Sequence, residues 1–207
     1  PPSKLKYRRM RALLASGRVL GARSTLTLSS WNDSEYIETE IEAGTFMFEG
    51  SRTGQEGSFE ESSEEAAHAL TFSSNAGQMY PGSSTYALFS VRTQSGSLGG
   101  TSQVQPPQWD RENPESLGHY LNYGIRILEG TTCNEETFAA SAQVVVDSET
   151  PLLEVEPQVT EQVLAPDAQE TVNYCIELAL PVGDNNDAQG ATVAPQWEFL
   201  GTSTVDE

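Results

Sequence analysis

The apolar residues of this chain come in short runs that Gly, Pro and Ser interrupt. Short runs rich in Val, Ile, Tyr and Phe that end at turn residues are typical of β-strands. We find no internal repeat and no heptad pattern. The spacing of the runs therefore predicts an all-β fold, a jelly-roll-like β-sandwich with long polar loops.

Several runs predict individual elements. Residues 120–128 alternate, with Tyr123, Ile125 and Ile127 on one face. Glycines from Gly96 onward are expected to close the strand at 85–91, and residues 50–65, dense in Gly, Ser and Glu, are expected to form a mobile loop. Strands are expected at residues 45–48, 70–72, 85–91, 120–128, 144–146, 171–180 and 191–200, and a short helix at 134–143.

Charge divides the chain at Trp31. Residues 1–30 hold seven Lys and Arg and no acid, whereas all thirty Asp and Glu follow, with four Arg and no Lys. A basic start, an apolar stretch and the small residues Ser29 and Ser30 before Trp31 predict a signal-like helix over 1–30, cleaved in this region, and a single exported domain over 31–207. Arg18 and Arg23 interrupt the apolar stretch, and a basic amphipathic helix that stays on the protein is the alternative.

An exported, acidic domain limits the partners and the cysteine chemistry. Its negative charge repels phosphate backbones, so we expect no nucleic-acid partner. The chain has two cysteines, Cys133 and Cys175. In an exported chain the pair is most simply a disulfide, and two buried thiols are the alternative.

Residues 37–43 alternate strictly. Ile37, Thr39, Ile41 and Ala43 share one face, and three glutamates share the other. This pattern predicts a half-buried strand.

The sequence resembles a known family at several places in order. Residues 31–36 (Trp-Asn-Asp-Ser-Glu-Tyr) followed by 43–46 (Ala-Gly-Thr-Phe) are similar to the start of mature TasA and camelysin-type proteins. The resemblance continues in Pro-Gly-Ser at 81–83, in Asn-Tyr-Cys at 173–175 and in the closing segment 191–199. It covers most of the chain and is nearest to the actinobacterial branch.

The resemblance implies a secreted, non-enzymatic structural subunit of cell-surface fibres or biofilm matrix, released by a dedicated SipW-type signal peptidase. In TasA the freed N-terminal segment completes a neighbour's sheet by donor-strand complementation. Residues 31–44 would be the donor here, with Ile37, Thr39, Ile41 and Ala43 facing the groove. The partner would then be a second copy, besides cell-surface or matrix components, and assembly should accelerate in salt, calcium or low pH.

Two alternatives stay open, one for residues 37–43 and one for the whole domain. Residues 37–43 are equally suited to be the first strand of their own sandwich. The domain as a whole suits a monomeric cell-surface binding or adhesion module of the same fold.

Catalytic and cofactor hypotheses rest on few residues. Camelysin-type proteins have been classed as metalloproteases, but this chain has only His68 and His119, which are far apart in sequence, so we expect no enzyme activity and no cofactor. The oxygen-rich residues 184–187 suit a weak calcium site or, more simply, a turn.

Two surface hypotheses complete the sequence reading. The carboxylate pairs at 60–61 and 64–65 are expected to be solvated charges rather than an acid–base pair. Large aromatic side chains suit either a sugar-binding face or the core; they are Phe46, Trp109, Trp197 and Phe199.

Overall fold

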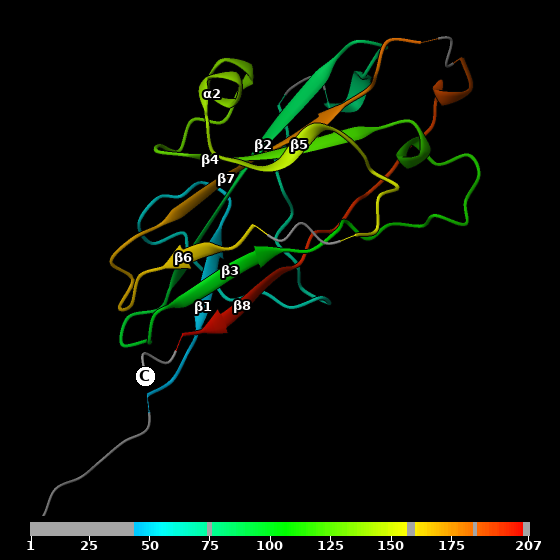
Figure 1. The fold of residues 1–207 in the computed structure, drawn as a ribbon. Helices are drawn as coiled ribbons and strands as arrows, with labels where there is room; N and C mark the ends of the chain where they lie inside the picture. Colours follow the sequence, from blue (N-terminus) through cyan, green and yellow to red (C-terminus); the bar gives the residue numbers. More distant parts are fainter. Residues whose placement is uncertain (1–43, 74–75, 157–159, 184–185, 205–207) are drawn as a thin grey trace, which may run out of the picture. The chain divides into compact units, whose positions relative to one another are not determined.

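The computed structural model describes residues 44–73, 76–156, 160–183 and 186–204 (Figure 1). The signal-like segment 1–30, the cleavage region at Ser29, Ser30 and Trp31, and the donor residues Ile37, Thr39, Ile41 and Ala43 lie outside them. Within the described ranges, no helix is both long and apolar enough to cross a membrane.

Strands dominate the described residues. They are β1 (Phe48–Ser51), β2 (Ser84–Thr93), β3 (Gly100–Val104), β4 (Asn122–Leu128), β5 (Val144–Pro151), β6 (Gln162–Leu164), β7 (Val172–Ala179) and β8 (Phe199–Ser203). The helical elements are short: α2 (Glu135–Ala140) and three 3-10 turns, η1 (Ala76–Gln78), η2 (Leu117–His119) and η3 (Asn186–Ala188).

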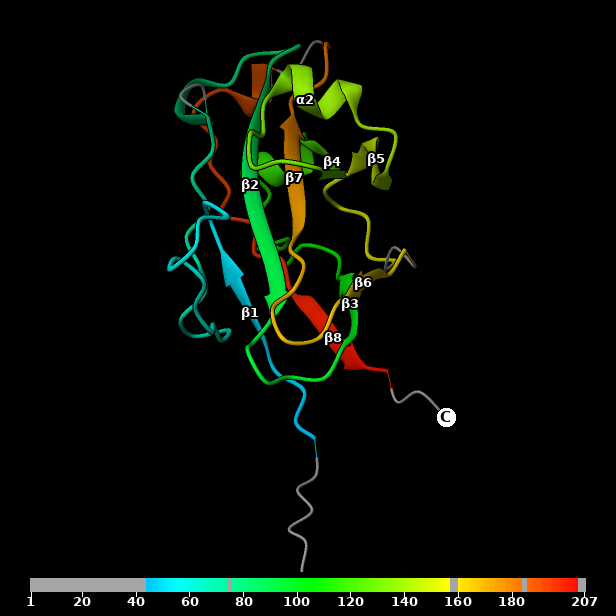
Figure 2. The same cartoon turned by 90° about the vertical axis from the view of Figure 1, so that its left-hand side faces the viewer.

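The strands form two antiparallel sheets. The larger has the order β1-β2-β7-β4-β5 and the smaller β6-β3-β8. Figure 2 shows β2 and β7 side by side in the larger sheet, with β1 beside β2. The expected all-β, two-sheet fold is confirmed.

The core lies between the two sheets, because inward side chains alternate along the strands. Tyr123 and Ile125 of β4 are fully buried, as their alternation predicted. Phe199 of β8 reaches the larger sheet, with its ring centroid 4.8 Å from that of Phe89 and 4.9 Å from that of Tyr174. The Tyr174 hydroxyl also donates to the Ser102 hydroxyl of β3, at 3.3 Å.

The large aromatic side chains belong to this core. Phe46, Trp109, Trp197 and Phe199 are partly buried and pack against the central cluster. The core interpretation of these four residues is therefore supported, rather than a sugar-binding face.

A disulfide joins β7 to the segment after β4. Cys133 and Cys175 are bonded, with their Cα atoms 5.4 Å apart, so the predicted pairing is confirmed. The short helix α2 follows, and Asn134 and Thr137 cap its start by bonding each other's backbone N–H. Phe138 of α2 packs on the disulfide's cluster, which covers the outer face of the larger sheet.

Other boundaries differ from the sequence expectation. Residues 70–72 form no strand: the side chains of Leu70 and Phe72 pack on the core, and the backbone hydrogen bond to β2 comes from the next residue, Ser73. The last strand begins only at Phe199, and before it one isolated bridge joins Gln108 to Gln196.

The sequence pattern does not predict the polar strand β3, because glycines at 96, 99 and 100 favour the end of a strand. Gly100 must be glycine there, since a Cβ would collide with the backbone carbonyl of Thr202 and lie 2.5 Å from the Phe46 ring.

Candidate functional site

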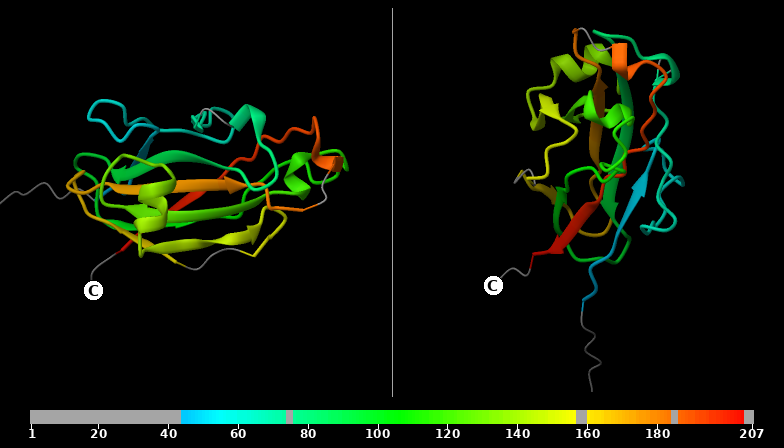
Figure 3. Two further views of the ribbon diagram at one scale, coloured as in Figure 1. Left: turned by 90° about the horizontal axis from the view of Figure 1, so that it is seen from above. Right: turned by 90° about the vertical axis from the view of Figure 1, so that its right-hand side faces the viewer.

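The two edges of the larger sheet differ, and they form the candidate site. Figure 3 shows β5 at one margin of this sheet, with the segment after β1 at the other. We call the β1–β2 side the covered edge and the outer side of β5 the open edge.

Backbone hydrogen bonds close the covered edge. The Gly50 N–H donates to the Glu60 carbonyl at 3.0 Å, and the Glu60 N–H donates to the Gly50 carbonyl at 2.9 Å. The segment after β1 therefore doubles back and pairs with β1. Further along, the Ser73 N–H donates to the Tyr86 carbonyl of β2, at 2.9 Å. The chain itself thus supplies the partners that an unprotected edge would seek.

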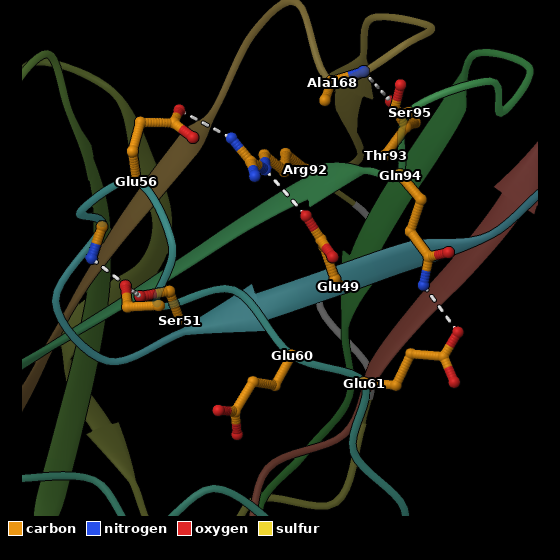
Figure 4. A network of polar contacts seen from close by, with 12 residues as sticks. Glu49, Ser51, Glu56, Glu60, Glu61, Arg92, Thr93, Gln94, Ser95 and Ala168 are labelled. Atoms are coloured by element: carbon orange, nitrogen blue, oxygen red, sulfur yellow. Dashed lines mark hydrogen bonds and ion pairs between the residues drawn. The ribbon is translucent and has the colours of Figure 1, made fainter.

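An arginine fastens the doubled-back segment (Figure 4). Arg92 lies directly opposite Glu49 in the β1–β2 pairing, and its Nε donates to that carboxylate at 2.9 Å. Its Nη1 donates to Glu56 at 2.7 Å, and its guanidinium stacks 4.0 Å from the Phe59 ring centroid. Burial lowers the pKa of Arg92, but the bonds to Glu49 and Glu56 outweigh this and raise it.

Ser51 shapes the turn at the start of this segment. Its hydroxyl accepts from the backbone N–H groups of Thr53 and Gly54, at 3.1 and 3.0 Å, and lies 2.6 Å from the Ser58 hydroxyl. Gly54 has φ +64°, a conformation that favours glycine. Residues 50–65, expected as a mobile polar loop, are therefore held by specific contacts, and Gly50 and Ser51 belong to β1.

The open edge has no such cover. Within the ranges that the structure describes, β5 pairs with β4 alone; at its last residue, the Pro151 carbonyl accepts a hydrogen bond from the Glu154 N–H, at 2.9 Å. An open hollow of about 610 Å³ lies beside it. Four carboxylates and one arginine contribute to its lining; we call the carboxylates the rim, and they are Asp147, Glu149, Glu154 and Glu156.

The arginine of the hollow is already engaged elsewhere. The Arg126 Nη1 donates to the Ser141 carbonyl, and the guanidinium lies 5.0 Å from the Phe138 ring centroid. Its Nε is buried without a hydrogen-bond partner. Neither ion pair found in the described part of the chain involves a rim carboxylate, so no salt bridge offsets the charge of the rim.

The two histidines of the chain, His68 and His119, have separate surroundings. The His68 Nε2 lies 3.2 Å from the Glu60 carbonyl, and that of His119 lies 2.9 Å from the Asn113 carbonyl. Among the described residues, no group of three or more His, Cys, Asp and Glu side chains could hold a metal ion.

The other candidates are surface features. The carboxylates at 60–61 and 64–65 are exposed, and Glu61 accepts a hydrogen bond from Gln94 at 2.6 Å. The weak calcium site was expected at residues 184–187. Asp184 and Asn185 lie outside the described residues, and residue 186 begins η3.

Sequence reasoning missed the contrast between the edges. The spacing of Glu49 and Glu56 from Arg92 carries no local signal, since the contacts span 43 and 36 residues.

No family model and no curated protein matches this chain.

Proposed function

We propose that this chain is an exported structural subunit that polymerises into extracellular fibres or biofilm matrix. Growth would proceed by N-terminal strand addition, residues 31–44 of one copy completing the sheet of the next. The partner is a second copy, and assembly of this kind does not close on itself, so it yields filaments. The proposal includes no catalytic step and no cofactor.

One observation carries the proposal: among the described residues no strand pairs with the outer edge of β5, while on the opposite edge Gly50 and Glu60 exchange backbone hydrogen bonds. Unpaired edge groups are a template for an added strand. The alternating residues 37–43 have the pattern such a strand needs, with one apolar and one polar face.

Two further features support export to an oxidising compartment. The Cys133–Cys175 disulfide is the kind of bond that persists outside the cytosol. The charge break at Trp31 places a basic, apolar segment before an acidic domain. A signal peptidase acting near Ser29 and Ser30 would then free the strand.

A monomeric cell-surface binding module is the second candidate, and features of β5 itself favour it. The strand carries Asp147 and Glu149, ends at Pro151, and shifts register against β4. Charges, proline and bulges are devices by which proteins discourage strand addition.

Negative-stain electron microscopy separates the two candidates. We expect filaments from the chain that begins at Trp31, incubated in moderate salt, and none from the full chain. The described core starts at Phe46, so removing residues 1–30 deletes none of it. Compact, monodisperse particles from both would refute the fibre proposal and favour the binding module.

A further inference from the structure

We propose that the outer edge of β5 accepts residues 37–43 of a second copy, and that the rim carboxylates regulate this step by charge repulsion. The inference rests on the proposed function, since it names the accepting surface and its control.

Length and coverage select β5 among the described strands. The covered edge is already paired through Gly50 and Glu60. In the smaller sheet the edge strands are shorter, since β6 has three residues and β8 has five. β5 has eight residues, enough to pair with all seven of the incoming segment.

The exposure of residues 146–150 indicates which side chains would meet. Val146 is buried in the core, whereas Asp147 and Glu149 are exposed and alternate with the half-buried Ser148 and Thr150. An incoming strand whose apolar face continues the core therefore places its glutamates beside Asp147 and Glu149. These glutamates are Glu38, Glu40 and Glu42.

Carboxylates placed opposite one another in neighbouring strands oppose pairing. Among the described residues, Arg126 forms no ion pair with the rim carboxylates, and its guanidinium contacts the Ser141 carbonyl and the Phe138 ring instead. Dissolved ions can offset the repulsion, since the screening length falls from about 30 Å at 0.01 M salt to about 3 Å at 1 M. The rim thus makes strand addition slow in dilute buffer and fast in salt.

The test compares three chains that all begin at Trp31: the unchanged sequence, the rim variant Asp147→Asn with Glu149→Gln, and the control Glu64→Gln with Glu65→Gln. Both variants remove two exposed carboxylates, but those of the control lie on the segment after β1, away from β5. Assembly is followed by light scattering from about 0.01 to 1 M salt, with microscopy of the end points.

We expect the rim variant to assemble about three- to tenfold faster than the unchanged chain at low salt, with a flatter salt dependence. The control should change the rate less than about twofold, because its charges lie far from the pairing strands.

Two outcomes overturn the inference and leave the proposed function standing. Equal acceleration by rim and control variants would mean that only total charge matters. An unchanged rate for the rim variant, while the parent forms filaments, would place strand addition at another surface. Failure of all three chains to assemble at any salt concentration would refute the proposed function as well.

Discussion

The two margins of the larger sheet solve the problem of an exposed edge in different ways. At the covered edge the chain doubles back, Gly50 and Glu60 exchange hydrogen bonds, and Arg92 fastens the returning segment. At the open edge β5 carries two exposed carboxylates, Asp147 and Glu149, two register shifts against β4, and a proline at its end. Hydrogen bonds satisfy an edge permanently, whereas charge merely repels a partner, and repulsion can be screened.

The largest predicted effect comes from the disulfide, which joins the central strand β7 to the segment after β4. Cys133→Ser with Cys175→Ser should lower the free energy of unfolding by about 4 kcal/mol, because the bond closes a long loop. Urea unfolding measures it, and amide exchange should rise at both edges. A loss of amide protection confined to β5, with Gly50 and Glu60 unaffected, would contradict the expectation that the disulfide stabilises both edges of the sheet.

Truncating the aromatic side chain that links the sheets should come next. Phe199→Ala removes ring contacts with Phe89 and Tyr174 and should cost about 3 kcal/mol of unfolding free energy. Leu200→Ala is the matched control, because Leu200 is 48% exposed and should cost far less. Similar losses for the two variants in urea unfolding would show that Phe199 does not join the sheets as described.

A smaller effect should be confined to the covered edge. Arg92→Gln leaves the partly buried Glu49 carboxylate without its charged donor and should cost about 2 kcal/mol. The Gly50 and Glu60 amides, which bond each other's residues, should exchange faster by NMR while those of β5 stay unchanged. Arg52→Gln is the control, since this exposed arginine has only a 3.4 Å contact with the Ala69 carbonyl. Unaltered exchange at Gly50 would mean that Arg92 does not fasten the segment.

The smallest effect should come from Glu56, the second carboxylate that Arg92 bonds. Glu56 is 86% exposed, and exposed ion pairs contribute little, so Glu56→Gln should cost less than about 1 kcal/mol. A loss as large as that of Arg92→Gln, measured in the same unfolding assay, would assign the fastening to Glu56 instead of Glu49.

Local patterns explain which parts of the fold could be predicted. The alternation in β4 and β7 and the capped start of α2 depend on residues close together in the sequence. Two cysteines allow one intramolecular pair. β3 could not be found in this way, because its polar run becomes a strand only through Ser102 and Val104 facing the core between β6 and β8.

The edges depend on the order of strands far apart in the sequence. β5 becomes an edge because β4 pairs with β7 on its other side, and Arg92 meets Glu49 only through the β1–β2 register. No pattern within a short window contains this information. The donor pattern at 37–43, in contrast, was visible at once, and it stays a prediction.

Amide exchange before and after assembly tests the central claim most directly. With the chain that begins at Trp31, the account predicts that β5, residues 144–151, gains protection in the filament while Gly50 and Glu60, protected from the start, do not change. Filaments in which β5 exchanges as fast as in the monomer, and the gain appears elsewhere, would contradict it.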